Sequence, residues 1–75
     1  MRNRICLDKQ SDVVEFVSIT ATLPGRIVLE GCDEDGVPCC VNARSVIGAL
    51  YSMSWSELYC NADHDIYQQI KKFVI

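Results

Sequence analysis

The stretch Val41–Leu50 reads VNARSVIGAL and places one serine directly before an apolar run. Ser45 is a residue type that caps helix N-termini, because its hydroxyl accepts a hydrogen bond from an unpaired backbone N–H. The same hydroxyl is also a candidate site for phosphorylation, since the N-terminal end of a helix favours negative charge. The stretch therefore predicts a strand that ends near Asn42 and a short helix that begins after Ser45.

Further strands are predicted on both sides of this helix. Arg26–Cys32 (RIVLEGC) and Val37–Asn42 (VPCCVN) flank the acidic segment Asp33–Gly36, whose composition is typical of a hairpin connection. Pro38 lacks a backbone N–H, which favours an edge or strand-entry position in the sheet. Ser56–Ala62 (SELYCNA) is the next predicted strand along the chain.

The N-terminal part of the chain gives one clear signal and one mixed signal. Arg4–Asp8 (RICLD) alternates apolar and polar residues, which predicts a short strand. Ser11–Leu23 is rich in β-branched residues, but Ser11 or Asp12 is a suitable N-cap and "LPG" is a suitable stop. We predict a helix here, because apolar residues fall near helical spacing at Val13, Phe16, Val17 and Ala21.

A last helix is predicted to begin at Asp63. Ile66, Ile70 and Phe73 follow at i, i+4 and i+7 and form one apolar stripe. The predicted order is then strand, helix, strand, strand, helix, strand, helix within a single domain, residues 1–75. This order favours an α+β fold in which the helices pack on one face of an antiparallel sheet.

Composition excludes several classes of function. Hydrophobic residues make up 49% of the chain and charged residues 23%, which indicates a globular domain. The net charge of −3, with no basic cluster beyond Lys71 and Lys72, argues against nucleic-acid binding. No apolar run approaches the roughly 20 residues that cross a bilayer, so we expect no membrane association and a cytoplasmic location.

The cysteines are predicted to be buried free thiols rather than disulfides or metal ligands. There are five, an odd number, and none forms a CxxC pair. Cys32, Cys39, Cys40 and His64 could nominally supply four zinc ligands, but adjacent cysteines in a strand point to opposite faces of the sheet. The acidic turn Cys32–Gly36 is too short for a calcium loop and is expected to be solvated. We therefore predict neither a metal site nor a cofactor.

The segment Cys40–Met53, CVNARSVIGALYSM, resembles the middle of HPr, the histidine-containing phosphocarrier of the bacterial sugar phosphotransferase system. The positions that match are Val41, Asn42, Arg44, Ser45 and Gly48. The resemblance implies an HPr-like open-faced sandwich with the order βαββαβα, in which four antiparallel strands carry three helices on one face.

The resemblance also implies what this chain lacks. An HPr carries phosphate on a histidine at the start of its first helix, followed by Ala-Arg-Pro. The matching segment here, Asp8–Val14 (DKQSDVV), has no histidine, arginine or proline. We therefore expect no catalytic residues and no enzymatic activity, but a regulatory or protein-binding module related to the phosphotransferase system. The alternative is a phosphocarrier that uses an unconventional acceptor such as His64, the only histidine.

The residues that would carry a regulatory function lie in and around the predicted middle helix. Ser45 matches the serine that a dedicated kinase phosphorylates in HPr proteins of Gram-positive bacteria, and Arg44 is expected beside that phosphate. Protein partners, among them phosphotransferase-system or regulatory proteins, are expected to contact the helix. The candidate partner-binding residues are Ile47, Leu50, Met53 and Trp55, and Trp55 is the one most expected at a surface contact.

Overall fold

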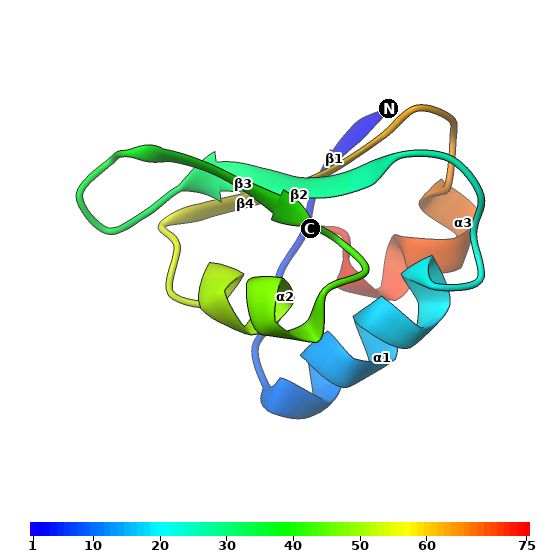
Figure 1. Cartoon of the computed structure of the whole chain (residues 1–75), viewed down its shortest axis with the longest axis horizontal. Coiled ribbons are helices and arrows are strands. Elements are labelled where there is room, and N and C mark those ends of the chain that lie inside the picture. The colour runs from blue at the N-terminus through cyan, green and yellow to red at the C-terminus, as the bar shows by residue number, and fades with distance from the viewer.

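Four strands and three α-helices alternate along the chain in the computed structural model, which describes residues 1–75 (Figure 1). The elements are β1 (Arg2–Arg4), α1 (Gln10–Thr20), β2 (Ile27–Cys32), β3 (Pro38–Asn42), α2 (Val46–Ser52), β4 (Glu57–Ala62) and α3 (Tyr67–Ile70), followed by a 3₁₀ turn at Lys71–Phe73. The predicted α+β class, with an antiparallel four-stranded sheet and three helices, is confirmed. None of the helices is long and apolar enough to cross a lipid bilayer.

The strands form one antiparallel sheet in the order β1-β4-β2-β3. The long strands β2 and β4 lie at its centre, where Leu29 pairs with Cys60. On its other side β2 pairs with β3, and Leu29 lies opposite Val41. Strand β3 is an edge strand that begins at Pro38, which confirms the position predicted for that proline.

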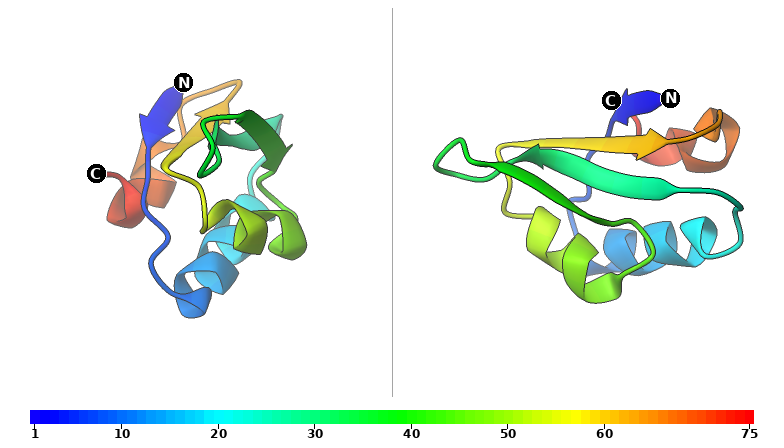
Figure 2. Two further views of the ribbon diagram at one scale, coloured as in Figure 1. Left: turned by 90° about the vertical axis from the view of Figure 1, so that its left-hand side faces the viewer. Right: turned by 45° about the horizontal axis from the view of Figure 1, so that its top comes forward.

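The helices and the sheet form two layers with a single core between them (Figure 2). Alternate residues of β2 and β4 point toward the helices, as the burial of Ile27, Leu29, Leu58 and Cys60 shows. The other face of the sheet is open to solvent. The residues of β2 and β4 that alternate with these buried ones point to that face, and they are half-buried or exposed. The helices contribute to the same core through Val13, Phe16, Val17, Ala49, Ile66, Ile70 and Phe73.

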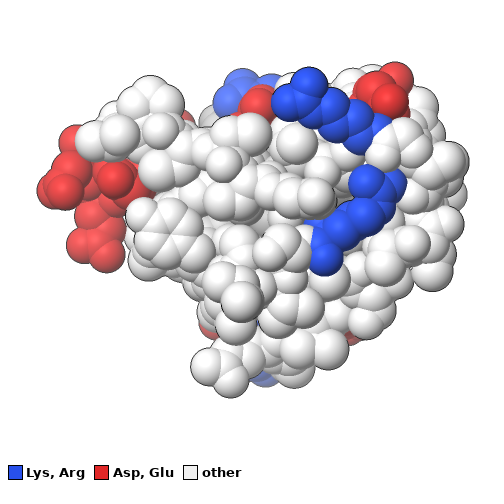
Figure 3. Space-filling view, viewed as in Figure 1, with Lys and Arg blue, Asp and Glu red and all other residues white.

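The connection between β2 and β3 is the tight acidic turn that its composition predicts. Gly36 has φ +81°, a left-handed conformation that favours glycine. Asp33 Oδ1 accepts the backbone N–H groups of Asp35 and Val37, each at 2.9 Å. The acidic side chains of this turn project at one end of the molecule (Figure 3).

Helix α1 is confirmed, although its ends differ from the prediction. It begins at Gln10 with Lys9 as N-cap, instead of Ser11 or Asp12, and it ends at Thr20 rather than Leu23. Asp12 contributes from the third helical position, where its carboxylate accepts the Lys9 backbone N–H at 3.1 Å. The buried face of this helix outweighs the strand propensity of its β-branched residues.

Strand β1 lies further toward the N-terminus than predicted. The alternation in Arg4–Asp8 is present, because Ile5 and Leu7 are buried. However, only Arg2–Arg4 pair with β4, and Ile5 forms an isolated bridge to Val74. The Ile5 backbone N–H still donates to the Leu58 carbonyl of β4 at 3.1 Å. The chain then leaves the sheet toward α1, so Leu7 packs on the core without a neighbouring strand.

The last helix is shorter than its apolar stripe suggests. Ile66, Ile70 and Phe73 are buried as predicted, with exposures of 1%, 0% and 4%. The α-helical part is confined to Tyr67–Ile70, and Asp63 does not cap it. The Asp63 carboxylate instead accepts the backbone N–H of Arg26 at 3.0 Å, which holds Asp63 against the start of β2.

Candidate functional site: the surface of α2

Ser45 caps α2 as the sequence predicts. Its backbone is extended, with φ −96° and ψ 117°, and its Oγ accepts the Gly48 backbone N–H at 3.1 Å. Gly48 lets this first turn lie close to the sheet, since a Cβ at that position would be 3.1 Å from the Val41 Cβ. The side chain of Ser45 is half-buried, at the point where the loop from β3 enters the helix.

The outer surface of α2 is apolar and carries no charge. Ile47 is 82% exposed, and Tyr51 is 58% exposed one helical turn later. Val46 and Leu50 lie beside them with exposures of 44% and 39%, while Ala49 faces the core. In Figure 3 the surface at the centre of the front, where α2 lies, is white, with blue side chains to its right and red ones to its left. We call Val46, Ile47, Leu50 and Tyr51 the α2 patch.

The structure separates the predicted partner-binding residues into two groups. Ile47 and Leu50 are exposed in the α2 patch. Met53 is half-buried against the core, and Trp55 is only 8% exposed, which contradicts the expectation that it lies at a surface contact. Tyr51 packs edge-on against Trp55 with ring centroids 6.0 Å apart. Tyr51 is the exposed aromatic residue that the prediction missed, although its i, i+4 spacing from Ile47 could have indicated it.

Arg44 points away from the position expected for it. Its Nε donates to the Thr20 carbonyl at 3.1 Å, and its Nη2 donates to the carbonyls of Leu23 and Gly25. The guanidinium therefore satisfies the carbonyls at and beyond the C-terminal end of α1, where a positive charge is favoured. Only Nη1 takes no part in these hydrogen bonds.

Replacing Ser45 with alanine tests its capping role. The variant loses the acceptor for the Gly48 N–H, so we expect the free energy of unfolding to fall by about 1 kcal/mol. Urea denaturation of the two proteins measures the difference. Ser45→Asp is the matched control, because aspartate is also a good cap and should retain most of the stability. Equal stability of the alanine variant and the wild type would contradict the capping role.

The start of α1, the segment compared above with the histidine-carrying segment of HPr proteins, is acidic in this chain. Asp12 accepts the backbone N–H of Asp8 at 3.1 Å as well as that of Lys9. Cys6 donates a hydrogen bond from Sγ to Asp8 Oδ1 at 3.3 Å, and this bond raises the pKa of the thiol. The region thus holds carboxylates and a protonated thiol, which do not favour an incoming phosphoryl group.

His64 lies in the loop before α3 and is oriented by its neighbour. Its Nδ1 is 2.7 Å from Asp63 Oδ1, and Asp63 is itself fixed by the Arg26 N–H. The Arg26 hydrogen bond, followed by the His64 contact, lowers the pKa of Asp63. Gly25 makes room for this arrangement, because a Cβ there would lie 2.3 Å from Asp63 Oδ1. The Nε2 atom of the ring remains without a protein partner.

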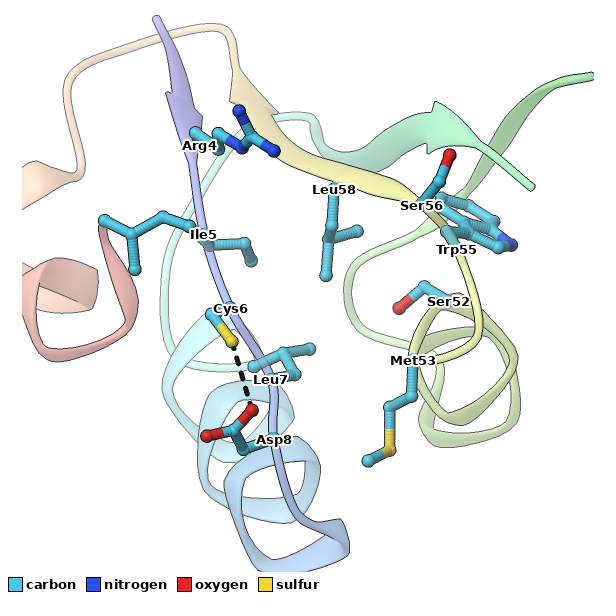
Figure 4. Close-up of a pocket in the computed structure, with 11 residues that line it drawn as sticks. Arg4, Ile5, Cys6, Leu7, Asp8, Ser52, Met53, Trp55, Ser56 and Leu58 are labelled. Carbon is cyan, nitrogen blue, oxygen red and sulfur yellow. Dashed lines mark hydrogen bonds between the residues drawn. The ribbon is translucent and has the colours of Figure 1, made fainter. Parts of the chain in front are cut away.

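A cavity of about 200 Å³ opens between the segment after β1 and the connection from α2 to β4 (Figure 4). Ile5, Leu7 and Leu58 give it a largely apolar wall. Its three hydroxyl or thiol groups all donate hydrogen bonds: Ser52 to the Ala49 carbonyl at 2.7 Å, Ser56 to the carbonyls of Cys32 and Asp33, and Cys6 to Asp8. The cavity therefore lacks an activated nucleophile.

All five cysteines are free, but only Cys60 is buried, so the prediction of buried thiols is wrong for the others. Cys6 and Cys40 are exposed, and Cys32 and Cys39 are half-buried. No group of three or more histidine, cysteine or acidic side chains is placed to hold a metal ion.

Burial raises the pKa of Cys60 to about 11 from about 9, so this thiol should react more slowly than an exposed one. A raised pKa means that the protonated thiol stabilises the fold fully below pH 9, and this contribution is lost as the pH rises through 11. We expect iodoacetamide at pH 8 to modify Cys40 well before Cys60, as peptide mass spectrometry measures. Equal modification rates in the folded protein would contradict the burial of Cys60.

Comparisons with protein-family models, with curated proteins and with solved structures find no match for this chain.

Proposed function

We propose that this chain is a protein-binding module of HPr-like type that binds its partner through the α2 patch and is regulated by phosphorylation of Ser45. The observation that carries the proposal is the α2 patch itself, an uncharged apolar surface around Ile47, which is 82% exposed. Exposed apolar residues that cluster on one element are typical of protein contact sites. Aromatic residues such as Tyr51 are enriched among the residues that dominate binding energy.

The position of Ser45 supports its role as a regulatory residue. It immediately precedes the α2 patch, so a phosphate on its Oγ would add about −2 charge beside an uncharged surface. The backbone N–H of Gly48, which already binds this hydroxyl, would be available to the phosphate. Phosphorylation would thus change what the α2 patch binds more than it would change the fold.

The arrangement of elements also supports an HPr-like assignment. The chain has the order βαββαβα, with an antiparallel four-stranded sheet and one open face. The segment that carries the resemblance forms the end of β3, the loop with Arg44, and α2. The absence of a histidine in Asp8–Val14 supports regulation rather than phosphate transfer as the function.

Intact-mass spectrometry after incubation with HPr kinase and ATP tests the regulatory part. We expect one acid-stable phosphate per chain, which Ser45→Ala abolishes. Ser54→Ala is the matched control, because Ser54 is an exposed serine beyond the C-terminal end of α2. A phosphate that persists in Ser45→Ala, or no phosphate at all, would contradict regulation at Ser45.

Calorimetric titration with enzyme I of the phosphotransferase system tests the binding part. Ile47→Asp places a charge at the centre of the α2 patch, so we expect the Kd to rise at least about tenfold, the size of a contact worth more than about 1 kcal/mol. Val14→Asp is the control, since Val14 is a 56% exposed aliphatic residue on α1. Lack of binding, or equal effects of the two substitutions, would contradict docking on the α2 patch.

A phosphoryl relay through His64 is the second candidate function. The Asp63 carboxylate lies 2.7 Å from Nδ1 and leaves Nε2 without a hydrogen-bond partner, an arrangement in which a carboxylate orients a nucleophilic imidazole. Incubation with enzyme I and phosphoenolpyruvate would then yield an acid-labile phosphate that His64→Asn removes. Without that phosphate, the relay is excluded and the binding function is unaffected.

A further inference from the structure

The open face of the sheet brings together two free thiols from neighbouring strands. In the register of β2 and β3, Glu30 pairs with Cys40 and Cys32 pairs with Pro38. Cys32 and Cys40 are therefore diagonal neighbours on the same face, the face opposite the helices. Cys39 follows the other alternation of β3 and packs toward the core with its neighbours. Cys40 is exposed and Cys32 is half-buried.

The spacing of such a pair suits a bridging metal better than a disulfide. Diagonal neighbours in an antiparallel sheet lie about 7–8 Å apart, with a somewhat shorter distance between their Cβ atoms. A disulfide requires Cβ atoms only about 3.5–4.5 Å apart. Metal–thiolate bonds are about 2.3 Å long, so two sulfurs on opposite sides of one ion are about 4.6 Å apart. Two cysteine side chains on such a diagonal can lean toward each other until their sulfurs are that far apart.

The surroundings of the pair favour an ion that needs two ligands. Both thiols line a shallow groove of about 420 Å³. The carboxylate of Glu30 is drawn to the opposite side, where it accepts from Arg2 Nε at 3.0 Å and from Asn61 Nδ2 at 3.1 Å. Cys39, Glu30 and Glu57 also line the groove, but no group of three or more histidine, cysteine or acidic side chains is placed to hold a metal ion. A pair of soft sulfur donors alone does not satisfy Zn²⁺, which takes four ligands, but it suits soft Cu(I).

We propose that Cys32 and Cys40 bind one Cu(I) ion between them as a two-coordinate bis-thiolate. Each thiol releases its proton to solvent and forms one sulfur–copper bond, so the copper remains Cu(I) and nothing is oxidised. The resulting site carries a charge of −1. The charged side chains that line the groove are Arg2, Glu30 and Glu57, and Arg2 is paired with Glu30 at 3.0 Å. The site lies on the opposite side of the molecule from the α2 patch. The copper proposal does not depend on the function proposed for the α2 patch.

Anaerobic titration with the Cu(I)–bicinchoninate complex tests the site. We expect the reduced protein to withdraw one Cu(I) per chain from the coloured complex. Cys32→Ser or Cys40→Ser should weaken the binding by at least about 100-fold, because the second sulfur then no longer acts at high effective concentration. Cys39→Ser and Cys6→Ser are the matched controls, and both should bind copper as the wild type does.

Several results would overturn the proposal. One is failure of the wild type to withdraw copper, and another is a loss of binding in Cys39→Ser or Cys6→Ser as large as that in Cys40→Ser. A copper-bridged dimer in native mass spectrometry would show that the thiols act between chains. Thermal unfolding verifies that each variant is folded, and Cys40→Ser keeps the test decisive because its side chain is exposed.

Discussion

Phe16→Ala is expected to lower the free energy of unfolding by about 3–5 kcal/mol, the usual cost of removing a fully buried phenylalanine. Phe16 is 0% exposed and contacts Phe73 edge-on, with ring centroids 5.5 Å apart. This contact ties α1 to the C-terminal turn. At about 0.05–0.15 kcal/mol per residue, the whole domain is stable by only about 4–11 kcal/mol. The variant should therefore be largely unfolded at modest urea concentrations, as circular dichroism can measure.

Val14→Ala is the matched control for this prediction. Val14 lies on the same helix but is 56% exposed, so its truncation should change the stability by less than about 0.5 kcal/mol. Similar losses in the two variants would mean that the buried face of α1 is assigned incorrectly.

Arg44→Ala is expected to destabilise the protein by about 2–3 kcal/mol, within the range for hydrogen bonds made by a charged group. The substitution removes the donors to the carbonyls of Thr20, Leu23 and Gly25, which hold the end of α1 and the loop after it. Because the variant is less stable, it should also unfold at a lower temperature in a calorimetric scan.

Two further variants separate this role from a role in binding phosphate. Arg44→Lys should recover only part of the stability, since an ammonium group cannot reproduce the planar fork of donors. Arg26→Ala should be close to neutral, because the Arg26 side chain is exposed and its backbone N–H to Asp63 is retained. If Arg44→Ala left the stability unchanged and altered only phosphate binding, the structural role would be wrong.

The sequence predicts the elements of this fold better than their exact pairing. Helix α1 follows from the spacing of Val13, Phe16 and Val17, which the structure buries together. The end of β1 could not be found in this way, because Leu7 continues the alternation of Ile5 although the chain has left the sheet by that residue. Alternation reports which residues are buried, and it does not report whether a partner strand is present.

The candidate site shows the same division. The Ser45 cap depends on contacts within one helical turn and was predictable. Trp55 was placed wrongly because its burial depends on distant residues, among them Gly31, where a Cβ would lie 3.3 Å from the Trp55 ring. The sequence predicts that the Arg44 guanidinium lies beside a phosphate on Ser45, but its hydrogen-bond partners are backbone carbonyls 19 to 24 residues away. A hydrogen bond to a backbone carbonyl cannot be predicted from residue types, because every residue has that carbonyl.

The sheet order has a consequence for how the chain acquires its structure. Strand β4 lies between β1 and β2 and pairs with both. Neither β1 nor the β4-facing edge of β2 has a partner strand without it. Beyond the β2–β3 hairpin, no part of the sheet can form until the residues up to Ala62 have been synthesised. Such non-local pairing slows folding, and the apolar residues of β2 stay exposed until β4 arrives. A growing chain therefore carries the unpaired edge of β2 from the synthesis of Cys32 until that of Ala62, and contact with chaperones is most useful in this interval.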